Sequence, residues 1–217
     1  MHILVMAKTP VPGRVKTRLC PPCTPAEAAA VASAALADTL EAVSRCGADR
    51  RIIALDGEPG PWLPEGFELI AQRGRGLGER LGAAWQDAGG PGFQIGMDTP
   101  QLTADDLDDA LSHLDRPGPA PAVLGPATDG GWWGVGMARP SVDAFAGVPM
   151  SSAEAGAAQR RRLEALGMDV HLLAERRDID TVDDLWAVSE LVVGGRVPVL
   201  VASLDHLRAG TAWGTRP

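Results

Sequence analysis

Segments with strand character alternate with segments with helix character along nearly the whole chain, and this alternation limits the fold more than any other feature. The continuous apolar run at residues 3–7 predicts a strand buried on both faces of a parallel sheet. Thr24, Pro25 and Glu27 have the spacing of a capped helix start. The helical pattern then continues to about Arg45.

The same patterns predict further elements of both kinds. Strands are expected at residues 51–56, 67–71, 93–97, 122–124, 132–137 and 170–173. Helices are expected at 78–88, from Thr103, from Ser151 to about Gly167, and from Thr181. This order predicts an α/β fold with a mainly parallel sheet covered by helices on both faces, with ligands bound beyond the carboxyl ends of the strands.

A chain of 217 residues fits one domain, which we expect over residues 1–193. Residues 194–217 form a tail whose predicted role is an edge strand or a contact with a second subunit in a homodimer. With 20 basic and 28 acidic residues the net charge is −8, which disfavours nucleic acid as a partner. The apolar runs are too short for a signal peptide or a membrane span, so we expect a cytoplasmic protein.

The three cysteines fit a reducing compartment better than a disulfide scaffold. Cys20 and Cys23 have the spacing of a redox pair, but two prolines between them stiffen the segment. We therefore assign no redox role to this pair.

Positive charge is concentrated directly after the first predicted strand. The loop carries the cations Lys8, Arg14, Lys16 and Arg18. The two lysines among them are the only lysines of the chain, and compact ammonium groups suit phosphate oxygens. Gly13 lets the backbone approach a ligand closely. The spacing matches neither the Walker nor the Rossmann pattern, so we predict a different polyphosphate-binding loop; a solvated basic loop is the alternative.

Three aspartates occupy positions that favour metal binding. Asp98 follows an apolar strand, where a carboxylate faces the ligand crevice. Asp178 and Asp180 alternate around Ile179, so both carboxylates project from one side of an extended segment. Carboxylate oxygens suit a hard cation such as Mg²⁺. For Asp98 a turn aspartate that binds the local backbone is an equally good interpretation.

A glycine-rich segment lies between these loops. Asp129 is followed by Gly130 and Gly131, which favour a tightly folded backbone beside a substrate. Trp132 and Trp133 come next and predict either an aromatic wall of an acceptor pocket or a surface that stacks on a base, although tryptophan is more often part of the core.

Four ordered motifs resemble the arsenosugar-type glycosyltransferases, a family associated with radical-SAM and selenodomain proteins. They lie at residues 7–19, 96–100, 125–131 and 178–181. The resemblance extends to about Leu191 and implies the three-layer nucleotide-diphospho-sugar transferase (GT-A-like) fold, shared with phospholactate and molybdenum-cofactor guanylyltransferases. Met97 and Trp132 depart from the family pattern, which usually has a small residue and a tyrosine at these positions.

The resemblance also implies roles for individual residues. Nucleotide phosphates would lie on Lys8, Gly13, Lys16 and Arg18, to which we add the neighbouring Arg14 and Thr17. A Mg²⁺ or Mn²⁺ ion would lie on Asp98 together with Asp178 and Asp180. From the glycine-rich segment itself, and not from the resemblance, we predict an acceptor pocket that includes Gly130, Gly131 and Trp132.

These assignments predict a metal-dependent transferase that takes a nucleotide sugar or a nucleoside triphosphate and a small-molecule acceptor. In glycosyl transfer, which the resemblance favours, Asp129 is the candidate base. In nucleotidyl transfer, the alternative, Lys16 and Arg18 offset charge on the departing pyrophosphate. A catalytically silent nucleotide-binding module is the third interpretation.

Overall fold

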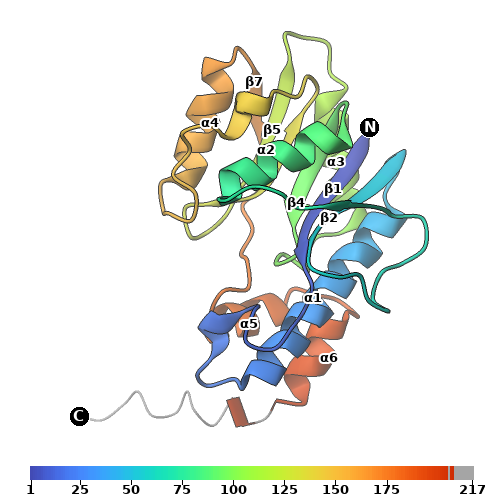
Figure 1. Cartoon of the computed structure of the whole chain (residues 1–217), viewed down its shortest axis with the longest axis vertical. Helices are drawn as coiled ribbons and strands as arrows, with labels where there is room; N and C mark the ends of the chain where they lie inside the picture. The colour runs from blue at the N-terminus through green and yellow to red at the C-terminus, as the bar shows by residue number, and fades with distance from the viewer. Residues whose placement is uncertain (205, 208–217) are drawn as a thin grey trace.

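A seven-stranded sheet forms the centre of the computed structural model, which describes residues 1–204, 206 and 207 (Figure 1). The strands are β1 (His2–Lys8), β2 (Arg50–Asp56), β3 (Glu68–Ala71), β4 (Gly92–Gly96), β5 (Pro121–Pro126), β6 (Trp132–Met137) and β7 (Asp169–Leu172). Their order is β3-β2-β1-β4-β6-β5-β7. Neighbouring strands are parallel except at β6, which is antiparallel to β4 and β5. The predicted α/β fold with a mainly parallel sheet is confirmed.

Helices cover both faces of this sheet. They are α1 (Pro25–Arg45), α2 (Leu77–Ala88), α3 (Ala104–Leu114), α4 (Ala155–Ala165), α5 (Val182–Ser189) and α6 (Arg196–Ala202), with short 3-10 helices η1 (Thr17–Leu19) and η2 (Val142–Phe145). None of the helices in the described part of the chain combines the length and the hydropathy needed to cross a membrane.

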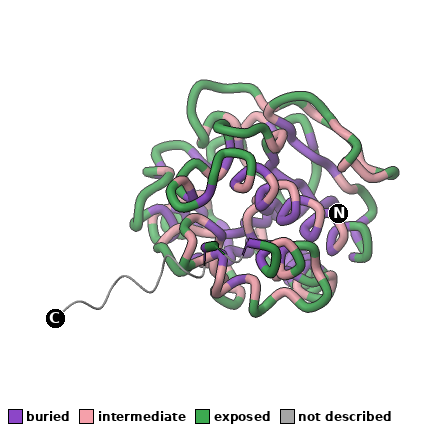
Figure 2. Tube along the Cα trace, turned by 90° about the horizontal axis from the view of Figure 1, so that it is seen from below, coloured by how far each residue is buried: buried purple, intermediate pink, exposed green. Residues whose placement is uncertain are grey.

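Alternation of side chains along the strands divides the core into two layers. Ile3 and Val5 of β1 join a buried cluster with α1 and α3, whereas Leu4 and Met6 join a second cluster with α2 and α4. In Figure 2 the buried residues gather in the interior of the trace and the exposed residues follow the peripheral loops. A third cluster joins one side of α1 to α5 and α6.

Local capping chemistry explains three of the predicted helix starts. Thr24, Thr103 and Thr181 each accept a backbone N–H in a reciprocal capping box, at the starts of α1, α3 and α5. The predicted start at Ser151 is wrong, because α4 begins at Ala155. Ser151 has a left-handed φ of 61°, which interrupts a right-handed helix, so the preceding segment forms a turn.

The reversed direction of β6 positions part of the site. Because β6 is antiparallel to its neighbours, its first residue lies at the same sheet edge as the ends of β1, β4 and β5. The β5–β6 connection at residues 127–131 therefore lies at the edge where ligands bind in sheets of this class.

The tail does not form an edge strand over residues 196–202, which make up helix α6 packed against α1. Asp38 of α1 caps this helix from a distance, because its carboxylate accepts the backbone N–H groups of Arg196 (2.8 Å) and Val197 (2.9 Å). The Arg196 guanidinium also lies 3.2 Å from the Asp38 carboxylate. The expected contact with a second subunit stays a prediction, and residues 205 and 208–217 of the tail lie outside the described residues.

Substituting Asp38→Ala should lower the free energy of unfolding by roughly 2 kcal/mol, because α6 loses its cap and a charge-assisted hydrogen bond. Amide exchange at residues 196–202 should become faster in the same variant. Glu41→Ala is the control, since Glu41 contacts the same Arg196 through its side chain only. Glu41→Ala should lower the free energy of unfolding by less than about 1 kcal/mol. Equal decreases in the two variants would argue against the capping role of Asp38.

Candidate active site

A cavity of about 590 Å³ lies at the carboxyl edge of the sheet. It is lined by the loop after β1, the turn after β4, the start of β6, and the segment before α5. The predicted site residues that line it are Lys8, Arg14, Lys16, Thr17, Arg18, Asp98, Asp129, Gly131, Trp132, Asp178 and Asp180. Of the predicted set, Gly13 and Gly130 are not among the lining residues. The structure thus brings together segments that lie more than 160 residues apart in the sequence, such as those of Lys16 and Ile179.

Lys16 lies between two of the candidate metal ligands. Its Nζ is 2.8 Å from Asp98 Oδ1 and 3.7 Å from Asp180 Oδ1, and it donates a hydrogen bond to the Ile179 carbonyl. The Lys16 side chain is only 6% exposed, so these contacts are shielded from solvent. The ammonium of Lys16 therefore offsets part of the negative charge of Asp98 and Asp180, two of the three carboxylates predicted to bind a metal.

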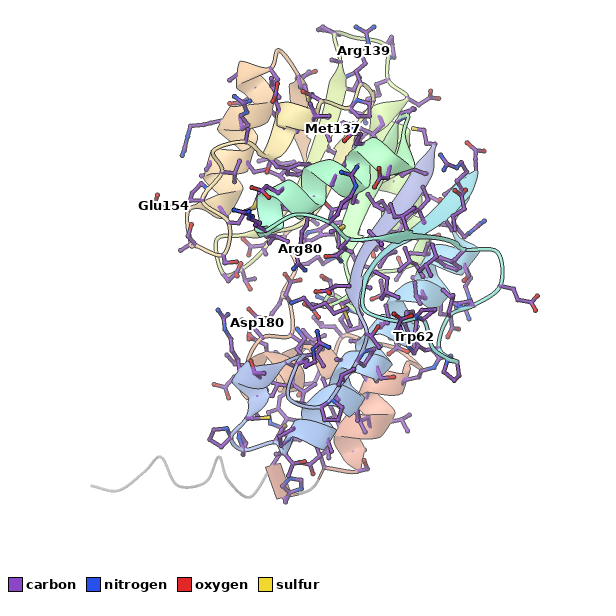
Figure 3. All side chains as sticks on the ribbon, viewed as in Figure 1. Trp62, Arg80, Met137, Arg139, Glu154 and Asp180 are labelled. Atoms are coloured by element: carbon purple, nitrogen blue, oxygen red, sulfur yellow. The ribbon has the colours of Figure 1, made fainter. Side chains whose placement is uncertain are left out.

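The other cations of the loop differ in their surroundings. Arg18 lies 3.0 Å from Asp180 Oδ2 and remains 71% exposed. Lys8 and Arg14 line the cavity, and neither forms an ion pair with another described residue. Arg80 of α2, labelled in Figure 3 opposite Asp180, pairs with Asp56 at 2.7 Å and does not line the cavity. The lining cations thus all come from the end of β1 and the loop after it.

Asp178 is the most perturbed carboxyl of the site. Burial raises its pKa to about 6, with a further upward contribution from the charges of Asp98 and Asp129. A hydrogen bond from Thr99 Oγ1 at 2.5 Å and the charge of Lys16 oppose this rise. A desolvated carboxyl in a cleft, with named charged neighbours, is typical of a functional site.

In metal-free protein, Asp178→Asn should raise stability at pH 7 and leave it unchanged at pH 4. A carboxyl whose pKa rises from 3.8 to about 6 on folding binds its proton more tightly in the folded state, so stability falls as pH rises between these values. The difference corresponds to about 3 kcal/mol at pH 7. Urea denaturation of both proteins at the two pH values measures it. A gain of equal size at pH 4 would show that the titration of Asp178 is not its cause.

The three aspartates do not converge on one point. Among the described residues, no group of three or more His, Cys, Asp or Glu side chains is arranged to hold a metal ion. The repulsion between neighbouring carboxylates and the ammonium of Lys16 between Asp98 and Asp180 explain this arrangement. The all-oxygen donor set nevertheless suits Mg²⁺ or Mn²⁺, which take one or two carboxylates together with substrate phosphates.

The glycine segment is held tightly against the turn before α4. Gly130 has a φ of 86°, and a Cβ there would lie 2.2 Å from the carbonyl oxygen of Ala153. Gly156 N–H donates to the Gly130 carbonyl at 2.9 Å. Asp129 Oδ1 accepts the Gly131 N–H at 2.8 Å, so one of its oxygens is already bound within its own turn.

The two tryptophans have different roles in the structure. Trp132 is partly exposed, lines the cavity and stacks on Phe145 with ring centroids 6.2 Å apart. Trp133 is 4% exposed, packs in the core and donates from Nε1 to the Ala174 carbonyl at 3.0 Å. Both tryptophans line the cavity, but Trp132 is the more exposed of the two, and Trp133 chiefly supports the fold.

The cavity has further lining residues outside the predicted set, although the sequence offered the loop at residues 72–76 as another possible ligand loop. Gln72 donates from Nε2 to the carbonyls of Ala7 and Ala54, both at 2.9 Å, and so joins the ends of β1 and β2. Thr99 orients Asp178, as described above. Gln94 lies on β4 within an apolar strand pattern, and a polar residue at such a position is a signal that could have identified it.

The chain belongs to the DUF2064 family, described as uncharacterized proteins conserved in bacteria, whose model matches residues 27–152. No curated protein matches the chain. The matched range contains Asp98 and Asp129 but neither the basic loop nor Asp178 and Asp180.

Solved structures give the fold class. A candidate nucleotide-diphospho-sugar transferase from Desulfovibrio desulfuricans G20 is 26% identical, with a TM-score of 0.84 and 95% of each chain covered. A nucleotidyl transferase from Methanothermobacter thermautotroptrophicus is 16% identical, with a TM-score of 0.55, over 87% of this chain and 95% of that one. Rv0371c of Mycobacterium tuberculosis H37Rv, in complex with manganese, is 15% identical, with a TM-score of 0.52, over 86% and 96%. The chain therefore has the nucleotide-diphospho-sugar transferase fold.

Proposed function

We propose that the protein is a divalent-metal-dependent transferase that binds a nucleotide sugar and transfers the sugar to a small-molecule acceptor. The observation that carries this proposal is the meeting of the basic loop with Asp98, Asp178 and Asp180 around one cavity at the carboxyl edge of the sheet. Cations and carboxylates together suit a metal-bound nucleoside diphosphate. The similarity to the Desulfovibrio protein supports the same class of substrate.

In this proposal the loop after β1 binds the diphosphate. Lys8 and Arg14 have no ion pair to give up, and Lys16 and Arg18 exchange carboxylate partners for phosphate oxygens. Thr17 supplies a hydroxyl group beside them, and Gly13, with a φ of 77°, allows the loop to turn. A Mg²⁺ or Mn²⁺ ion bound by Asp98 with Asp178 and Asp180 would stabilise negative charge on the leaving diphosphate.

The acceptor binds next to Gly131 and Trp132, which line the same cavity. The second oxygen of Asp129 is the candidate acceptor for the proton of the attacking hydroxyl, because the first is bound to Gly131 N–H. The cations that line the cavity all lie at residues 8–18 and are assigned here to the nucleotide phosphates, which leaves no lining cation for a phosphorylated acceptor. This distribution favours an uncharged acceptor and hence glycosyl transfer.

Nucleotidyl transfer is the second candidate. The four cations of the loop match the longer phosphate chain of a nucleoside triphosphate, and a nucleotidyl transferase shares the fold. In this reaction Lys16 and Arg18 would stabilise the departing pyrophosphate.

Calorimetric titration with UDP-glucose, GDP-mannose, UTP, GTP and CTP, each with and without Mg²⁺, tests the proposal. We expect Mg²⁺-dependent binding of one nucleotide sugar to exceed that of the matching triphosphate. Preference for a triphosphate would contradict glycosyl transfer and favour nucleotidyl transfer. Binding that is independent of Mg²⁺ would contradict the proposed role of the metal. A lack of any binding would indicate a catalytically silent module.

A further inference from the structure

Gln94 is a buried polar residue at the floor of the cavity. It lies on β4 and pairs in register with Leu4 of β1 and Val135 of β6, both of which belong to the apolar cluster beneath α2. The residue is only 2% exposed, yet it is one of those that line the cavity. Its neighbours Phe93 and Ile95 point to the other face of the sheet.

The side chain of Gln94 has a buried polar atom without a hydrogen-bond partner in the described part of the chain. Its Oε1 is buried and has no partner among the described residues. A buried carbonyl oxygen without a donor is costly, and such groups in folded proteins call for a specific explanation. An aliphatic side chain at this position would extend the surrounding core at no such cost, so the amide points to a requirement other than stability.

The surroundings define what Gln94 is able to bind. On its side of the sheet the cavity is lined by apolar side chains that include Met6, Leu81 and Trp132. Gln94 lies two residues before Gly96, the last residue of β4. It is therefore about 7 Å inside the sheet from the strand end that leads to Asp98. Because an amide oxygen only accepts hydrogen bonds, a phosphate or carboxylate would leave Oε1 without a partner, whereas a neutral O–H or N–H donor would satisfy it.

From these observations we infer that Gln94 recognises an uncharged hydrogen-bond donor of the bound substrate and determines its specificity. The inference rests on the proposed function, because it takes the ligand of the cavity to be a nucleotide sugar. Such a ligand has two groups of this chemistry, a hydroxyl of the transferred sugar and an N–H of the nucleobase. A site that hydrogen-bonds one substrate group discriminates strongly against analogues that lack it.

The test compares Gln94→Met with the unmodified protein by calorimetry in the presence of Mg²⁺. The probes are UDP-glucose and GDP-mannose, with UDP and GDP as the matching diphosphates without sugar. We expect roughly 10- to 100-fold weaker binding of the preferred nucleotide sugar. A loss confined to the nucleotide sugar identifies the sugar hydroxyl as the partner, and an equal loss for the diphosphate identifies the base. Affinity within about twofold of the unmodified protein overturns the inference.

Two further variants separate recognition from folding. Gln159→Met is the control, because Gln159 is also fully buried with an unpartnered Oε1 but does not line the cavity. It should lower the melting temperature, since its amide donates to the Ala144 carbonyl at 2.8 Å, and leave nucleotide affinity unchanged. Gln94→Asn retains the amide, shortens its reach and should weaken binding without loss of fold. Equal weakening in Gln159→Met overturns the inference, whereas a lack of nucleotide binding in the unmodified protein overturns the proposed function and this inference with it.

Discussion

Asp98→Asn should abolish metal-dependent nucleotide binding and lower turnover by more than roughly 100-fold, because changes even to the partners of metal ligands cost 10- to 100-fold. Asp98 follows β4 at the edge of the cavity, and its Oδ1 lies 2.8 Å from Lys16 Nζ. The substitution keeps the size of the side chain and removes the negative charge that attracts both the ammonium and a divalent cation. Titration of Mg²⁺ and of Mg²⁺-nucleotide into the variant measures the effect.

Asp105→Asn is the matched control, because Asp105 is an exposed aspartate of α3 that does not line the cavity. It should retain both metal and nucleotide affinity. Unchanged turnover and metal affinity in Asp98→Asn would remove Asp98 from the site and leave it as a turn residue that orders the segment after β4.

Lys16→Ala should weaken the binding of nucleotides, and the loss of affinity should grow with the number of phosphates. We expect roughly 10- to 100-fold weaker binding of a nucleoside triphosphate, a smaller loss for the diphosphate, and no loss for the nucleoside. The lysine is the buried cation of the loop, and an ammonium shielded from solvent interacts strongly with phosphate oxygens. Calorimetric titration with a nucleoside and its mono-, di- and triphosphate measures this series.

Two variants qualify the result for Lys16. Lys16→Arg keeps the charge and a partner for Asp98 and Asp180, so it should lose less affinity than Lys16→Ala. Arg161→Ala, which removes an exposed cation of α4 outside the cavity, should leave the series unchanged. An equal loss for the nucleoside and the triphosphate would mean that Lys16 maintains the shape of the cavity and does not bind phosphate.

Local chemistry made much of the fold predictable. The capping box of α1 needs only Thr24 and Glu27, which are three residues apart, and the sequence therefore locates the helix start correctly. Helix α6 could not be found in this way. Its valines favour a strand, and the helix depends on a carboxylate of α1 that lies 158 residues away along the chain.

The site shows the same division. That the motif residues share one sheet edge is predictable, because parallel strands bring their carboxyl ends together and the following loops meet there. The contact of Lys16 with Asp98 and with the Ile179 carbonyl is not predictable from the sequence, since it depends on where the segment after β7 crosses the sheet. The unpartnered oxygen of Gln94 likewise depends on every side chain packed around it.

The contact between Gly130 and Ala153 has a consequence for attempts to change the acceptor. Because the backbones of residues 127–131 and 151–156 touch and share the hydrogen bond from Gly156 to Gly130, neither segment has room to change shape alone. A loop grafted from a relative would clash with the resident partner unless both segments were exchanged together. The two segments of this chain are therefore expected to tolerate exchange only as a pair.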